Sequence, residues 1–397
     1  MLSKKVLLTN IDVFSEDGVI PNGYVLFDEK KIIEVGDVPA PIEKEDVEVF
    51  QFRDGYSLVP GFIDLHIHGA GGADTMDATN EALTTMAEIL PKEGTTSFLA
   101  TTMTTATEDI EKALENVANY MDSSNQQGRA EVLGIHLEGP FLSPKRVGAQ
   151  NPKRIIEPSI ELFKNWQEIA NQNIKLVTLA PECNGGIELT TFLKQTGIVA
   201  SIGHSNATYA EVKTAIDAGV THATHLYNQM RELHHREPGV VGAVLMHDEV
   251  RCEIIVDGVH SRPEMVHFAY KNKGSNGLVL ITDAMRAKCL GEGTYDLGGQ
   301  EVIVTSEKAT LKDGTLAGSI LKLKDACQNM MKFTGCSLKE IVEMASGNPA
   351  KQLGIFDRKG SIKVGKEADL VVLDENGEVK LTFCRGVLTY NGEEGEV

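Results

Sequence analysis

The sequence has no hydrophobic run long enough to cross a membrane, since none approaches the roughly 18 apolar residues that a transmembrane helix needs. The short apolar run near the start is broken by Asn10 and Asp12 before it reaches the length of a signal peptide, and no small-residue cleavage site follows. Basic residues are also few: 38 Lys and Arg stand against 57 Asp and Glu, a formal net charge of −19. This excess of acid argues against general affinity for nucleic acid or anionic membranes, but a local basic pocket for an anionic small molecule stays compatible with it.

Cysteine is sparse and shows no pattern. The six cysteines are scattered without a C-x-x-C pair, so in a long chain without an export signal we expect free thiols in a reducing cytoplasm. A dinucleotide-binding glycine fingerprint and a G-x-S-x-G elbow are absent as well. What is present is an ordinary globular composition, 42% hydrophobic and 24% charged, in 397 residues. That length accommodates one large barrel or two domains.

The first 58 residues have the pattern of short strands and turns. Runs typical of β-strands occupy Val6–Asn10, Tyr24–Asp28 and Lys31–Val35. Turns are expected at Asp17-Gly18 and at Pro21-Asn22-Gly23, because Gly, Pro, Asn and Asp favour turn conformations. No segment of helical period interrupts these runs, so this part of the chain is predicted to be all β.

From Pro60 onward, apolar runs of strand length alternate with longer amphipathic segments, a pattern typical of βα units and a parallel sheet. Eight strands are predicted, at Phe62–His68, Thr96–Thr101, Val132–Glu138, Ile174–Ala180, Ile198–Gly203, His222–Leu226, Arg251–Val256 and Leu278–Thr282. Helices are predicted between them at Asn80–Leu90, Glu108–Met121, Ser159–Asn171, Tyr209–Ala218 and Pro263–Asn272. Eight strands with intervening helices indicate an α/β fold, the (β/α)8 TIM barrel.

The remainder of the chain changes character twice. An irregular glycine-rich stretch follows Thr282, and helices are predicted near Leu323–Phe333 and Leu338–Ala345. Strands return at Leu370–Leu373 and Val379–Phe383. We therefore expect the two β-rich ends, residues 1–58 and 359–397, to pair into a small β-sandwich domain beside a barrel of residues 59–358.

The strongest local signal is a pair of histidines in one strand. His66 and His68 are two residues apart, so they project from the same face at the end of the first barrel strand. Two imidazoles placed in this way can bind one metal ion. An isolated H-x-H is more often structural, but this pair follows strand residues and precedes the glycine-rich loop 69–72. Its position favours the functional interpretation.

Further polar side chains stand at or just after other strand ends, and they are Glu138, His204, His225, His260 and Asp283. The carboxyl ends of the strands form the face where barrel enzymes place their active sites. Each residue alone has a structural explanation: Asp283 could cap a helix, and His204 could hydrogen-bond a strand end. Seven such residues at one face favour a shared metal or proton-transfer site.

These motifs resemble the amidohydrolase superfamily of metal-dependent barrel hydrolases. Several segments more narrowly resemble the family of N-acetylglucosamine-6-phosphate deacetylases, in order and over nearly the whole chain. They are His136-Leu137-Glu138-Gly139-Pro140-Phe141, Gly203-His204-Ser205-Asn206-Ala207, Thr224-His225-Leu226-Tyr227-Asn228, Arg236-Glu237-Pro238-Gly239, Asp257-Gly258-Val259-His260 and Leu316-Ala317-Gly318-Ser319. The implied reaction is hydrolysis of N-acetyl-D-glucosamine 6-phosphate to D-glucosamine 6-phosphate and acetate, in amino-sugar catabolism.

The resemblance also implies roles for the residues at the strand ends. Glu138, His204 and His225 would bind the main catalytic metal, while His66 and His68 would bind a second metal that Glu138 bridges. Asp283 would be the general base, which takes a proton from the attacking water and later delivers it to the amine. His260 would hydrogen-bond the scissile carbonyl oxygen or a sugar hydroxyl. One or two divalent ions per subunit are expected, and Zn, Fe, Co and Mn all suit such ligands.

The substrate contacts are expected from a second set of residues. Arg236 offers a planar fork for the phosphate, with a surface salt bridge to Glu237 as the alternative. The backbone near Asn228 and Gln229 would add donors. Gln150 stands where some relatives carry histidine, and Leu316 and Ala317 belong to the last of the matching motifs. The family resemblance further implies a homodimer, in which a neighbouring subunit could complete the phosphate site; Arg262 is a candidate for that contribution.

Two other functions stay open at this point. A cyclic amidase of the dihydroorotase or hydantoinase type usually bridges its metals with a carboxylated lysine from strand four, but the only lysine there is Lys175, near the start of the strand. A non-catalytic barrel would be expected to lose metal ligands, and this chain keeps the full set. We therefore expect an enzyme in the cytoplasm that acts on an amino-sugar phosphate and binds neither nucleic acid nor membranes.

Overall fold

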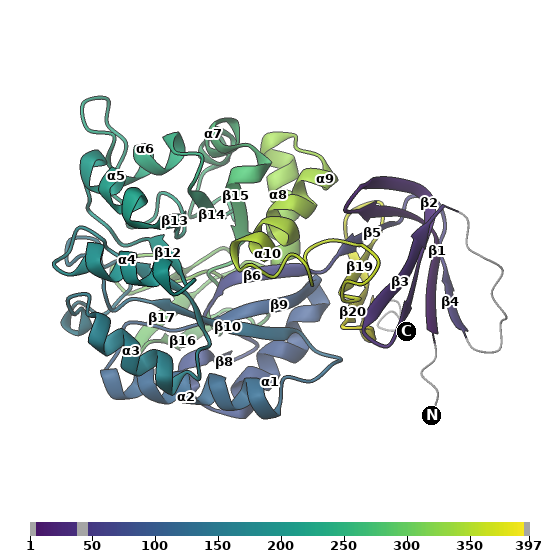
Figure 1. The fold of residues 1–397 in the computed structure, drawn as a ribbon, viewed down its shortest axis with the longest axis horizontal. Coiled ribbons are helices and arrows are strands. Elements are labelled where there is room, and N and C mark those ends of the chain that lie inside the picture. Colours follow the sequence, from purple (N-terminus) through teal and green to yellow (C-terminus); the bar gives the residue numbers. More distant parts are fainter. Residues whose placement is uncertain (1–4, 38–46, 393–397) are drawn as a thin grey trace.

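The computed structural model describes residues 5–37 and 47–392, and it places a large barrel beside a smaller sheet (Figure 1). The barrel sheet has eight parallel strands that follow one another in sequence order. They are β6 (Phe62–Ile67), β9 (Thr95–Thr101), β10 (Glu131–Glu138), β11 (Ile174–Leu179), β12 (Val199–Ile202), β13 (Val220–Ala223), β14 (Arg251–Ile255) and β15 (Leu278–Ile281). The predicted barrel strands are thus confirmed, most to within a residue or two at each end.

The first and last barrel strands meet through their carboxyl ends. The backbone N–H of Asp283 donates to the carbonyl of His66 over 2.8 Å, and that of His68 donates to the carbonyl of Ala284 over 2.9 Å. These bonds join the segments that follow β6 and β15, and they nearly close the barrel. Because they involve site residues, closure of the barrel fixes the site directly.

Helices surround the barrel, and most of them bury one face. They are α1 (Asn80–Ile89), α2 (Thr107–Ser123), α3 (Ile160–Ile169), α4 (Gly186–Gln195), α5 (Tyr209–Ala218), α6 (Gly239–Met246), α7 (Pro263–Lys273) and α8 (Leu323–Thr334). In α2 the buried residues Ile110, Leu114 and Val117 recur at helical spacing, which is why the sequence predicts this helix. The sequence pattern missed α4, which has no side-chain cap, and α6, which is apolar on every side and so has no period to detect. No helix among the described residues is long and apolar enough to span a membrane.

The two chain ends pair into a separate sheet, as predicted. Its strands are β1 (Lys5–Ser15), β2 (Gly18–Asp28), β3 (Lys31–Gly36), β4 (Val47–Gln51), β5 (Ser57–Pro60), β19 (Leu370–Leu373), β20 (Val379–Cys384) and β21 (Val387–Asn391). The sheet folds over its own apolar core, because Phe27 of β2 packs edge-on against Phe383 of β20 with ring centroids 5.3 Å apart. These two strands are separated by three others in the sheet, so opposite halves face each other as in a sandwich.

Two predictions for irregular regions were wrong. The expected turn Pro21–Gly23 lies within β2, where register shifts against β1 absorb the extra residues. The stretch after Thr282 contains a three-stranded antiparallel sheet of β16 (Gly293–Leu297), β17 (Gln300–Val304) and β18 (Ala309–Thr310). The helix predicted at Leu338–Ala345 is confirmed and extends further, as α9 (Leu338–Val342), a π-helical turn and α10 (Asn348–Gln352).

The remaining elements are a small hairpin and several single helical turns. Strands β7 (Gly69–Ala70) and β8 (Ala73–Asp74) form a small hairpin after β6. Single helical turns lie at Thr75–Asp77, Leu90–Glu93, Pro152–Arg154, Ser275–Gly277 and Glu343–Gly347. All six cysteines are free thiols, as the sequence predicted.

Candidate metal centre and active site

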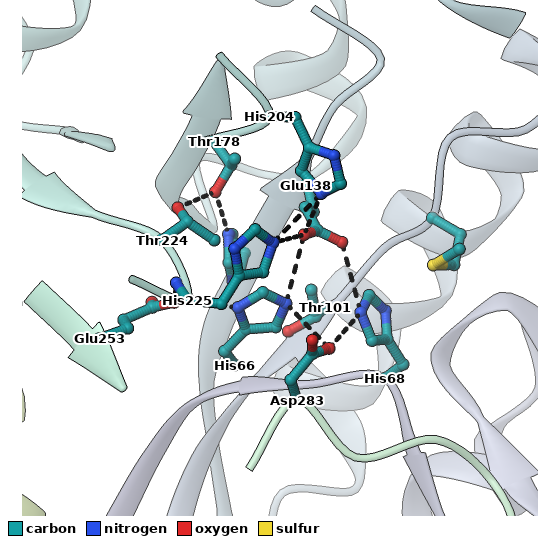
Figure 2. Close-up of polar contacts among 12 residues, drawn as sticks. His66, His68, Thr101, Glu138, Thr178, His204, Thr224, His225, Glu253 and Asp283 are labelled. Atoms are coloured by element: carbon teal, nitrogen blue, oxygen red, sulfur yellow. Dashed lines mark hydrogen bonds and ion pairs between the residues drawn. The ribbon is translucent and has the colours of Figure 1, made fainter. Parts of the chain in front are cut away.

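The polar residues at the strand ends converge at one mouth of the barrel (Figure 2). Glu138 is the last residue of β10, His66 belongs to β6, and His204 and Asp283 come two residues after β12 and β15. One placement was wrong: β13 ends at Ala223, so His225 lies in the following loop and not at the end of its strand. His204, His225 and Asp283 all have positive φ, between 33° and 48°. Such backbone is costly for residues other than glycine, and active sites are among the places where it clusters.

The first cluster consists of Glu138, His204 and His225. Glu138 Oε1 lies 3.3 Å from His204 Nε2 and 3.2 Å from His225 Nε2, and the two imidazole nitrogens are 3.1 Å apart. The backbone carbonyl of Arg146 lies 2.8 Å from His204 Nδ1 and orients the ring. Three potential ligand atoms thus point at one position within a buried pocket.

The second cluster consists of His66, His68 and Asp283. Asp283 Oδ1 lies 3.4 Å from His66 Nε2 and 3.2 Å from His68 Nε2. Glu138 faces this cluster too, because its Oε2 lies 3.3 Å from His68 Nε2. Oε1 of Glu138 also lies 3.5 Å from His66 Nε2, so Glu138 contacts members of both clusters, as a bridging ligand would.

These residues fit divalent metal ions. Nε2 of His66 is buried without a hydrogen-bond partner, although it points at two carboxylates (Figure 2). Burial lowers the pKa of His68, but Asp283 and Glu138 outweigh burial and raise it to about 9. Burial alone would raise the pKa of Glu138, but the surrounding histidines outweigh burial and hold this pKa well below its usual range. Two buried carboxylates lie among four imidazoles, and a bound cation would offset their negative charge. Imidazole with carboxylate is a donor set that suits Zn, Fe, Co and Mn.

A layer of buried polar residues supports the clusters. Gln150 donates to Glu138 Oε2 over 2.7 Å and accepts the backbone N–H of Thr104 over 2.9 Å. His136 contacts Thr178 Oγ1 over 2.7 Å through Nε2. Glu253 contacts His66 Nδ1 over 3.0 Å. Sequence reasoning missed Glu253, although a glutamate between apolar neighbours in a barrel strand was a signal that could have identified it.

The clusters open into a cavity of about 340 Å³. Its lining includes five of the predicted substrate contacts, namely Gln150, Asn228, Gln229, His260 and Leu316. Two others are placed elsewhere: Ala317 is fully buried, and Arg236 is exposed with its guanidinium against His235. Among the described residues that line the cavity there is neither lysine nor arginine.

His260 is held in place by a neighbouring carboxylate. Its Nδ1 lies 2.7 Å from Asp257 Oδ2, and Oδ1 of the same side chain accepts the backbone N–H of His260. Burial lowers the pKa of His260, but Asp257 outweighs it, so the net pKa is raised. The contact with Asp257 stabilises the protonated ring, and in that form Nε2 is a donor that can face the cavity that His260 lines.

Comparison with known proteins gives a consistent set of relatives. The model of the amidohydrolase family matches residues 57–389. An N-acetylglucosamine-6-phosphate deacetylase of Bacillus subtilis is 50% identical over 398 aligned residues, which cover all of both chains. A solved deacetylase of the same name from Thermotoga maritima is 38% identical with a TM-score of 0.87, covering 97% of this chain and 100% of that one. A variant of the Mycobacterium smegmatis enzyme, solved in complex with N-acetyl-D-glucosamine-6-phosphate, is 31% identical with a TM-score of 0.90, covering 98% and 100%.

Proposed function

The chain belongs to the amidohydrolase family, and we propose that it hydrolyses N-acetyl-D-glucosamine 6-phosphate to D-glucosamine 6-phosphate and acetate. The observation that carries this proposal is the convergence of Glu138, His204 and His225 on one buried position beside a cavity, with Asp283 in the adjoining cluster that Glu138 also contacts. The names of full-length relatives support the choice of substrate, as does the sugar phosphate bound in a structural relative. A cyclic amidase is disfavoured because Glu138 takes the bridging place that a carboxylated lysine would occupy.

Glu138, His204 and His225 would hold one divalent ion, and His66 and His68 would hold a second with Glu138 between them. A bound divalent ion lowers the pKa of a water ligand from 15.7 to about 7 and polarises a carbonyl oxygen. Zn, Fe, Co and Mn are the ions that we propose for these ligands.

The chain itself supplies the proton transfers. Asp283 lines the cavity, and its Oδ1 faces both His66 and His68, so its carboxylate is placed to accept a proton from the attacking water. The same carboxyl group then delivers the proton to the leaving amine, because the two jobs fall in different steps. His260 donates a hydrogen bond to the carbonyl oxygen of the acetamide, where negative charge develops.

The phosphate binds at the outer part of the cavity through neutral donors, with Asn228 and Gln229 as the proposed contacts. A phosphate dianion without a cationic partner is poorly compensated, and the described lining offers no lysine or arginine. We therefore propose a homodimer in which an arginine of the neighbouring copy completes the site. Exposed apolar side chains are available for such a contact, and they include Leu233, Met246 and Phe268 at 39% to 56% exposed. The six free thiols support a cytoplasmic location.

A direct assay tests this function. The metal-loaded protein is incubated with N-acetylglucosamine 6-phosphate, and acetate and free amine are quantified by NMR. We expect stoichiometric release of both, with loss of turnover after chelation and recovery on adding metal. N-acetylgalactosamine 6-phosphate, dihydroorotate and hydantoin serve as comparison substrates. Faster turnover of any of these would replace the proposed substrate, and sedimentation in solution as a monomer would remove the proposed dimer.

A further inference from the structure

Glu253 lies in the middle of β14, and its side chain lies beside His66 and His225 (Figure 2). The side chain is fully buried. Its Oε2 is 3.0 Å from His66 Nδ1 and also accepts the backbone N–H of His225 over 3.1 Å. Its Oε1 is 3.1 Å from His222 Nε2. A single carboxylate therefore contacts one member of each proposed metal cluster.

The contact with His66 fixes which ring nitrogen carries the proton. A carboxylate against Nδ1 accepts a hydrogen bond there, which leaves the lone pair of Nε2 pointing toward Glu138 and Asp283. Nε2 is the atom that has no hydrogen-bond partner. A carboxylate bound to the outer nitrogen of a metal-ligating histidine is a recurrent arrangement that holds the ring and raises its basicity.

Glu253 also contacts the loop after β13, which carries His225 of the first cluster. His225 has a φ of 33°, a conformation that needs support from its surroundings. Glu253 supplies that support twice: its carboxylate binds the N–H of His225, and its backbone carbonyl accepts the N–H of Leu226 over 2.8 Å. The loop after β13 is thereby held where His225 Nε2 meets Glu138.

We propose that Glu253 is a positioning residue that orients His66 and the His225 loop for metal binding, an inference that rests on the proposed metal centre. A purely structural role explains the placement poorly. Barrel interiors are usually filled by branched apolar side chains, and burying a carboxylate costs several kcal/mol of desolvation. Here the histidines beside the proposed metal sites provide the compensating contacts.

The test measures metal affinity directly, by competition for Zn²⁺ with a chromophoric chelator in otherwise intact protein. Glu253→Leu removes both acceptors, and we expect affinity to fall about 100-fold; Glu253→Gln keeps one acceptor oxygen, and we expect about tenfold. Glu131→Gln is the matched control, because Glu131 is a mostly buried carboxylate at the opposite end of β10, paired with Arg358 and Lys359. This control should lower stability and leave Zn²⁺ affinity within twofold of wild type.

A second readout reports the Nδ1 proton of His66 without any turnover. In Zn²⁺-loaded protein with ¹⁵N-labelled histidine, wild type should give a His66 signal whose Nδ1 proton exchanges slowly with solvent, and Glu253→Leu should shift that signal and speed the exchange. Where Glu253→Leu does not fold, Glu253→Gln decides: Zn²⁺ affinity within twofold of wild type overturns the proposal. If wild type binds Zn²⁺ and releases acetate, and Glu253→Gln does both equally well, the role of Glu253 is refuted and the proposed function stands. A wild-type protein that binds no divalent ion refutes the metal centre and this inference together.

Discussion

The side-chain nitrogen of Gln150 lies 2.7 Å from Oε2 of Glu138, the carboxylate that faces both clusters. Gln150 is itself fixed, because its oxygen accepts the backbone N–H of Thr104. Without this contact, the carboxylate group of Glu138 loses one of the hydrogen bonds that fix its orientation. We expect Gln150→Leu to lower kcat about tenfold and to weaken metal binding by a similar factor, as disturbing an outer hydrogen-bond partner of a ligand does. Steady-state kinetics at saturating metal and chelator competition measure the two effects.

A neighbouring residue provides the control for this variant. Asn151 lies in the same loop and caps the turn Pro152–Arg154 through the N–H of Lys153, without contacting Glu138. Asn151→Ala should retain wild-type metal affinity. If both variants lose affinity equally, loop disorder and not the bond to Glu138 is responsible.

A variant of Asp283 is expected to impair proton transfer while metal binding is retained. Its carboxylate faces His66 and His68 and also lines the cavity. Asp283→Asn keeps the shape of the side chain but cannot accept the proton, so we expect turnover to fall 10²–10⁴-fold, the range for general acid–base groups. Glu138, His204 and His225 stay intact, so elemental analysis should still find metal. Turnover equal to that of wild type would remove Asp283 from the mechanism.

His260 and Asp257 are expected to act as a unit. Asp257 holds the ring through Nδ1 over 2.7 Å. His260→Asn should lower kcat about 10²-fold, because a donor to the developing oxyanion is lost. Asp257→Asn should produce a smaller loss in kcat, and the double variant should be no worse than His260→Asn alone, since both changes remove one function. Additive losses would show that the two residues act separately. The measurement is kcat and KM for all three variants.

Much of the barrel could be predicted because short runs rich in apolar residues, such as Leu278–Ile281, alternate with longer amphipathic segments. The ends of β9, β11, β14 and β15 were placed within one residue for this reason. Periodicity carries no information where every residue is apolar, so α6 was missed. It also fails where glycine-rich turns separate very short strands, as between β16 and β18.

The candidate site was predicted in its residue types but not in its internal contacts. Strand-end position was enough to bring Glu138, His204 and His225 together, because all strands of a barrel end at one face. The supporting role of Glu253 depends on its contacts with distant strands, which no local pattern reports. The position of Arg236 outside the cavity lining could not be predicted from the sequence either. The motif that contains Arg236 gives its neighbours along the chain but not the direction in which the loop runs.

The last prediction concerns acid stability. Glu131 is 14% exposed and lies against Arg358 and Lys359. Burial raises its pKa, but Lys359 and Arg358 outweigh burial and lower it from 4.5 to about 2. A carboxylate whose folded pKa is depressed stabilises the protein fully above the unfolded pKa, and this contribution is lost as pH falls toward the folded pKa. At 1.36 kcal/mol per pKa unit, the contribution is about 3 kcal/mol.

Glu131→Gln removes this titrating group, so the free energy of unfolding of wild type should fall about 3 kcal/mol more than that of the variant between pH 5 and pH 2. At pH 7 the variant should be less stable, because it leaves Lys359 without one of its partners. Urea unfolding followed by circular dichroism at several pH values measures both effects. Glu161→Gln, at an exposed position of α3, should run parallel to wild type. A constant difference between wild type and Glu131→Gln at every pH would show that the Glu131 carboxylate gains nothing from Lys359 and Arg358 on folding.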